Sequence, residues 1–185
     1  DISLGYDGDF QNKRFVDIIN NDLVNTIGNL LNRTSSMSRK WFDNKVPNNK
    51  KSSNTNKLES YSKETVKNYI NHFDSYKLDL AANDILDFAI KTNLFLNEKA
   101  PWILIKDQSN ISTVEDIIYS VLESTRIIGL LLLPILPELS SKIDIQLGSI
   151  YMKEVPWNDQ LNWGLLKADS ILPTPTPIIN KLEYE

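Results

Sequence analysis

The chain has 185 residues, of which 41% are apolar and 24% charged, as expected for one soluble globular domain with at most a small appendage. It contains no cysteine, which excludes disulfides and thiolate metal sites and is compatible with a reducing cytosol. The net charge of −4 argues against a general nucleic-acid-binding protein, because such proteins are usually basic.

The first predicted helix is long. Residues 7–10 are expected to form an initial turn, with Asp9 as the N-cap. From residue 11 to residue 42, one stripe of apolar side chains recurs at helical spacing: Phe15, Ile19, Leu23, Ile27, Leu30, Met37 and Trp41. Asn20, Asn21 and Asp22 are poor helix formers and predict a kink or break within this helix.

Basic residues concentrate in the part of the chain that follows. Residues 33–67 include nine basic and three acidic side chains, a net charge of +6, so the remaining residues carry −10. This asymmetry allows one local anionic partner on an otherwise acidic body. A solvated, lysine-rich loop is the alternative interpretation.

Three more helices are predicted before residue 135. Residues 48–56 form a polar, low-complexity loop, and a helix is expected over residues 63–75, with Ser62 as its cap. The next helix covers residues 77–99 and is ended by Pro101. Residues 112–115 have the form of a capping box and start a helix that runs to Pro134.

The last part of the chain is expected to be mostly irregular. A short helix is predicted from Pro137 to Gly148, and the final thirty residues contain four prolines and two tryptophans. No run of residues is typical of a sheet strand. We therefore predict an all-α fold, an up-and-down bundle of four to five helices with an irregular C-terminal tail.

No targeting signal or membrane span is predicted. The longest apolar run, residues 127–136, is too short to cross a bilayer and is interrupted by Pro134. We therefore expect a cytoplasmic protein.

The residues do not indicate catalysis. The single histidine, His72, lacks a Glu three residues before it, because Tyr69 occupies that position, so the Glu-x-x-His metal motif of helical bundles is absent. There is no Gly-x-Ser-x-Gly motif and no phosphate-binding glycine loop. The chain is therefore interpreted as a binding module without catalytic residues, metal or cofactor.

Two features are candidates for binding. Asn29 and Arg33 are four residues apart and lie outside the apolar stripe of the first helix, so both can contact one ligand group. An amide and a guanidinium are suited to reading base edges, although a plain polar helix face is the alternative. Trp102 follows Pro101 at a helix end, where an indole can stack on an unstacked base or serve only as a packing residue.

The chain resembles the C-terminal anticodon-binding domain of methionyl-tRNA synthetase, a class I aminoacyl-tRNA synthetase. The resemblance covers almost the whole chain and rests on an ordered set of short matches, none of which is specific alone. The matches are residues 7–10 (DGDF), 21–23 (NDL), 28–33 (GNLLNR), 40–43 (KWFD), 45–47 (KVP), 93–102, 122–134, 137–138 (PE), 148 and 163–166.

This resemblance implies that residues 1–10 are a junction from a catalytic half, residues 11–150 the helical anticodon-binding domain, and residues 151–185 a tail that packs on the bundle or toward that half. It implies that Trp102, fixed by Pro101, stacks on the first base of a CAU anticodon. Asn29 and Arg33 would hydrogen-bond anticodon bases. The residues 48–56 are unusually rich in Asn and Lys, and residues 173–183 follow the family only loosely.

The adenylate-site signatures and zinc-binding cysteines of the family are absent from this chain. The expected partners are therefore the anticodon loop of tRNA(Met) and an N-terminal catalytic domain, which in the parent enzyme uses ATP and Mg²⁺ to join methionine to its tRNA. Two alternatives remain: an anticodon-binding domain of a related class I synthetase, and a helical adaptor with no role in nucleic-acid binding.

Overall fold

Helices make up the regular structure of the described chain. The computed structural model describes residues 5, 7–48 and 56–183. The helices are, in chain order, α1 (Asn12–Ile18), the π-helix η1 (Ile19–Gly28), α2 (Asn29–Trp41), α3 (Asn56–Asp74), α4 (Leu78–Lys99), α5 (Pro101–Leu104), the 3₁₀-helix η2 (Gln108–Asn110), α6 (Ile111–Leu132), α7 (Pro137–Gln146) and α8 (Trp157–Gln160). No strand forms in this part of the chain, where Lys45 and Ile171 make an isolated antiparallel bridge. The predicted all-α bundle is confirmed.

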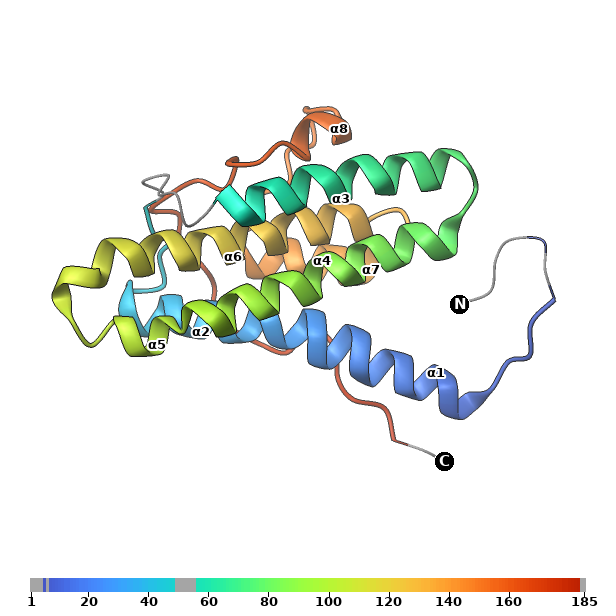
Figure 1. The fold of residues 1–185 in the computed structure, drawn as a ribbon, viewed down its shortest axis with the longest axis horizontal. Helices are drawn as coiled ribbons and strands as arrows, with labels where there is room; N and C mark the ends of the chain where they lie inside the picture. Colours follow the sequence, from blue (N-terminus) through green and yellow to red (C-terminus); the bar gives the residue numbers. More distant parts are fainter. Residues whose placement is uncertain (1–4, 6, 49–55, 184–185) are drawn as a thin grey trace.

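Helix α6 forms the centre of the bundle. Every residue from 116 to 132 is buried, on all faces of the helix. Helices α2, α3, α4 and α7 each pack against it, and Figure 1 shows the long helices lying side by side along a common direction. None of the helices in the described ranges combines the length and apolar character that a bilayer crossing requires.

Small hydroxyl side chains are buried within both α2 and α6. Thr34 of α2 and Ser124 of α6 are fully buried, and each donates a 2.8 Å hydrogen bond to the carbonyl of the residue four positions earlier in its own helix. Because each hydroxyl is satisfied within its own helix, it can be buried without leaving an unpaired polar group.

The expected weak point of the first helix takes the form of a π-helix. Residues 19–28 remain helical but are wound more widely, and the Thr26 hydroxyl donates to the carbonyl of Asn21, five residues earlier (2.8 Å). The wider turns change the angle between successive side chains, so the apolar stripe predicted from a uniform α-helix does not hold at its start. Phe15 is accordingly exposed, whereas Leu30 and Leu31 are buried.

One predicted helix start and three predicted N-caps are wrong, whereas α1 and α6 start within one residue of the predicted positions. Helix α3 begins at Asn56, seven residues before the predicted start, because Leu58 is drawn into the core, and Ser62 is buried inside the helix. Helix α1 follows an extended Gln11, whose side chain donates to Asp9. Helix α6 begins at Ile111, directly after η2, so the capping-box residues lie within it. Residues 49–55 of the predicted loop lie outside the described residues.

A buried ion pair fixes the C-terminal tail to α6. Glu123 and Arg126, 0% and 3% exposed, form a two-pronged salt bridge with contacts of 2.7 and 2.9 Å. The Glu123 carboxylate also accepts the backbone N–H groups of residues 164, 165 and 166, at 2.7 to 3.1 Å. Arg126 donates to the carbonyl oxygens of Gln160 and Asn162. Both charges are thus hydrogen-bonded to each other and to the backbone of the tail.

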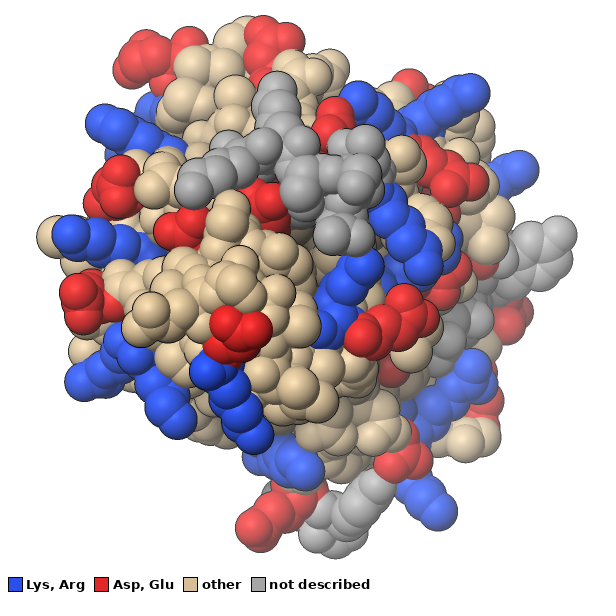
Figure 2. All heavy atoms as spheres, turned by 60° about the vertical axis from the view of Figure 1, so that its left-hand side comes forward, with Lys and Arg blue, Asp and Glu red and all other residues tan. Residues whose placement is uncertain are grey.

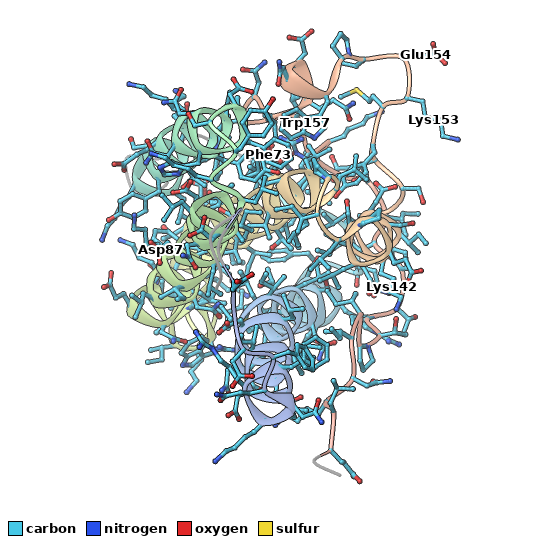
Figure 3. The ribbon with its side chains drawn as sticks, turned by 90° about the vertical axis from the view of Figure 1, so that its right-hand side faces the viewer. Phe73, Asp87, Lys142, Lys153, Glu154 and Trp157 are labelled. Carbon is cyan, nitrogen blue, oxygen red and sulfur yellow. The ribbon has the colours of Figure 1, made fainter. Side chains whose placement is uncertain are left out.

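The tail then runs back along the bundle. Trp157 packs its ring against Tyr69 of α3, with centroids 6.2 Å apart, and donates to the carbonyl of Leu130 in α6. Phe73 stacks on the same tyrosine ring at 5.5 Å, and Figure 3 labels both Trp157 and Phe73. Farther along, the backbone of Val46, just after α2, exchanges 2.9 Å hydrogen bonds with residues 169 and 170. The chain end finally reaches Asn20 of η1, which pairs with the backbone of Leu182.

We expect Glu123→Gln to lower the free energy of unfolding by roughly 3–5 kcal/mol, because it leaves Arg126 as an uncompensated buried charge. The amide nitrogen introduced at position 123 is a donor, so it would also face backbone N–H donors of the tail that the carboxylate accepts in the wild type. Urea denaturation measures the change. Lys63→Ala is the control, since it breaks only the exposed Lys63–Glu59 pair and should cost less than about 1 kcal/mol. Equal losses in the two variants would contradict this account of the tail.

Because the Tyr69 hydroxyl is buried, we expect the free energy of unfolding to fall at alkaline pH. Its hydroxyl is buried and has no hydrogen-bond partner among the described residues, and burial raises its pKa to about 12. An unfolded tyrosine ionises near pH 10, so the unfolded state releases its proton first and stability falls between about pH 10 and 12. We expect Tyr69→Phe to reduce this fall in stability. At pH 7 the variant should be at least as stable as the wild type. Urea denaturation at pH 7 and at the upper end of the alkaline range measures both effects. Tyr76→Phe, at an exposed site, is the control.

Candidate functional site

A sharp corner between α4 and α5 places an indole at the surface. Helix α4 ends at Lys99, and Ala100 adopts a left-handed conformation with φ of 43°. Pro101 is buried and occupies the first position of α5, where its missing N–H is tolerated. The corner leaves Trp102 38% and Ile103 60% exposed. Pro101 therefore ends α4 as predicted, and Trp102 lies on a short helix of its own.

The guanidinium of Arg33 lies over the Trp102 ring, at 5.7 Å from the ring centroid. Its Nη2 donates to Oδ1 of Asn97, in the last turns of α4, at 3.2 Å. Arg33 is thereby held between α2, α4 and α5 with a defined orientation. The structure thus brings together Arg33 and Trp102, two of the residues singled out from the sequence.

Asn97 is a site residue that the sequence analysis missed. Five residues before Trp102, it is one exposed asparagine among many, and no motif distinguishes it. Only the packing of α2 against the end of α4 gives it the Arg33 partner.

Asn29 is exposed at the first position of α2, one helical turn before Arg33. It lies at the junction where η1 passes into α2, and this junction is held from α4. The Asn93 amide donates to the carbonyl of Thr26 (3.1 Å) and to that of Ala89 in its own helix (3.0 Å). This contact fixes the rotation at which α2 presents Asn29 and Arg33.

The charge around the corner is mixed. Figure 2 shows basic and acidic side chains interspersed over this end of the molecule, with an uncharged area between them. Lys57 and Lys91 lie against the ring of Tyr61, and Lys57 also pairs loosely with Glu98 at 3.8 Å. Hydrogen bonding to Ser109, chiefly from its backbone N–H, lowers the pKa of Asp107, which adds a carboxylate to the charges near the corner.

The remaining titratable groups of the described residues form no metal-binding cluster. His72 Nδ1 lies 2.7 Å from Asp84 Oδ2, in a contact that joins α3 to α4. At the far end of the bundle, burial beside a largely apolar groove of about 240 Å³ raises the pKa of Asp22. In the part of the chain that the structure describes, no three His, Asp or Glu side chains are placed to hold a metal ion.

Comparison with known proteins shows that the bundle is an anticodon-binding domain of a tRNA ligase. A family model described as the anticodon binding domain of methionyl tRNA ligase matches residues 46–185. The chain therefore belongs to the methionyl-tRNA ligase family, within its anticodon-binding domains. Pro101 and Trp102 lie in the matched region, whereas Asn29 and Arg33 precede it.

Relatives and solved structures agree with this assignment. Methionine–tRNA ligase of Thermosynechococcus vestitus is 36% identical, over 98% of this chain and 36% of its own length. The Bacillus subtilis enzyme is 33% identical, over 100% of this chain and 28% of its length. The free-state crystal structure of Mycobacterium tuberculosis methionyl-tRNA synthetase superimposes with a TM-score of 0.91 at 26% identity, over 100% of this chain and 37% of that one. The chain thus spans about a third of the length of the proteins it matches.

The contact between Arg33 and Trp102 predicts an energetic coupling. A double-mutant cycle of Arg33→Ala and Trp102→Ala, measured by urea unfolding, should give a coupling of about 0.5–1 kcal/mol, the usual value for an exposed cation–π pair. The same cycle with Ile103→Ala in place of Trp102→Ala should give none. A zero value in the first cycle would show that the two groups are neighbours without an attractive interaction.

Proposed function

We propose that this chain is the module with which a methionine–tRNA ligase recognises the CAU anticodon of tRNA(Met). The observation that carries the proposal is the contact of Arg33 with the half-exposed Trp102 ring, at the surface of a family member's anticodon-binding domain. An indole supplies a stacking surface and a guanidinium supplies paired donors for a base edge. The net charge of −4 is consistent with recognition through bases more than through phosphates.

Each residue has a distinct proposed role. Trp102, which is 38% exposed, stacks on the first anticodon base, and the buried Pro101 fixes the ring's position. Arg33, oriented by Asn97, and Asn29, one turn earlier, hydrogen-bond anticodon bases. Stacking and good bidentate base contacts are each worth roughly 1–3 kcal/mol, so these contacts together suffice to discriminate strongly against other anticodons.

The activity of the whole enzyme is part of the same proposal. A catalytic domain elsewhere in the longer protein would join methionine to tRNA with ATP and Mg²⁺, in the cytoplasm. A related M. tuberculosis synthetase has been solved bound by methionyl-adenylate, the intermediate that such a reaction requires. This chain would supply the anticodon contacts and no reacting group.

We expect Trp102→Ala to weaken binding of a CAU anticodon stem-loop at least about tenfold, the low end of the cost of losing one stacked base. Trp102→Phe should retain most of the affinity, because the smaller ring still stacks. Titration with CAU and altered-anticodon stem-loops, followed by fluorescence anisotropy of a labelled RNA, measures the effect.

Ile103→Ala is the matched control, because Ile103 is a still more exposed apolar residue on the same short helix. It should bind like the wild type. A chain that binds all stem-loops equally at every salt concentration would instead be a helical adaptor or a non-specific binder, since phosphate contacts carry no sequence information.

A further inference from the structure

A groove is lined in part by Asn29 but not by Arg33 or Trp102. It has a volume of about 330 Å³. One wall is the η1–α2 helix, with Asn25, Asn29 and Asn32, and the other is the returning tail, with Pro177, Ile178 and Ile179. The volume lies at the low end of the range for small-molecule sites.

The three asparagines of this wall have unused hydrogen-bonding groups. Asn25, Asn29 and Asn32 are all exposed, and their side chains form no hydrogen bond within the described chain. Nearby amides behave differently: Asn93 and Asn97 are both engaged in contacts that hold the helices together. Each free amide offers donors and an acceptor, so the wall presents a row of groups able to read a planar polar edge.

The opposite wall is apolar. Ile179 is half-buried, Pro177 is exposed and Ile178 is buried beneath them. Gly28 lies beside this wall, and a Cβ at this position would make an ordinary van der Waals contact with the Ile179 side chain at 3.5 Å. Among the described residues, no basic or acidic side chain lines the groove. A phosphate would therefore have no cation to bind here. A flat, uncharged group with a polar edge would suit the groove better, because the asparagines can hydrogen-bond its edge and the apolar wall can contact its face.

We propose that this groove holds a second unstacked nucleobase of the anticodon loop, next to the base that stacks on Trp102. This inference rests on the proposed function. Asn29 connects the two proposed base positions. Arg33, one turn later on the same helix, contacts the indole, whereas Asn29 and Asn32 both line the groove. Asn25 and Asn32 hydrogen-bond the edge of the second base, and Ile179 contacts its face. The C-terminal tail is therefore part of the RNA-binding surface.

The test pairs protein variants with RNA in which the bases are removed singly. CAU stem-loops with an abasic residue at the first, second or third anticodon position are titrated against wild type, Asn32→Ala, Asn25→Ala and Trp102→Ala. We expect Asn32→Ala and Asn25→Ala to weaken binding of the intact loop about five- to tenfold each. These losses should vanish on the one abasic loop that lacks the base held in the groove, which is either the second or the third anticodon base. The Trp102→Ala loss should vanish only on the loop that lacks the first base.

Asn71→Ala, an exposed asparagine on α3, is the matched control and should leave all titrations unchanged. Circular dichroism checks that every variant is folded. Wild-type affinity of Asn25→Ala and Asn32→Ala for the intact loop would overturn the inference, as would losses that persist with every abasic loop. In either case a tenfold effect of Trp102→Ala leaves the proposed function standing, whereas no anticodon preference in any variant would refute that function itself.

Discussion

The buried pair of Glu123 and Arg126 is the interaction on which the rest of the structure depends. Both charges lie in the middle of a helix that is buried on all sides, where an ion pair is tolerated only if its remaining donors and acceptors are satisfied. Backbone groups of residues 160–166 satisfy them. Two buried charges thereby dictate the course of a segment that has little regular structure of its own.

This constraint extends to the candidate site. Once the tail is fixed on α6, it pairs with the backbone after α2 and then runs along η1 to form one wall of the asparagine-lined groove. The other half of the site depends on the end of α4, where a left-handed Ala100 and a buried Pro101 present the indole. The site is thus assembled from segments some 150 residues apart in sequence.

The two parts of the site differ in their freedom. Arg33 is held by Asn97 and by the Trp102 ring, so this part is ordered in advance and would lose little conformational entropy on binding RNA. The free amides of Asn25 and Asn32 have no such restraint and can adapt to a base edge. Asn25 belongs to the π-helix, a rare conformation, and the end of this helix is held by Asn93 from α4. This contact ties the rotation of α2 to the same helix that carries Asn97.

The sequence by itself determined the fold class, the longest helices and the pairing of Asn29 with Arg33 on one helix face. These follow from helical periodicity, from Pro101 as a helix stop and from the i, i+4 geometry, all of which are local. Only the tertiary structure decided that Asn97 holds Arg33, that residues 19–28 widen into a π-helix and that the tail faces three free asparagines. Those outcomes depend on which surfaces meet after folding, and neither a contact across 64 residues nor the satisfaction of a buried charge by a distant backbone leaves a periodic signal in the chain.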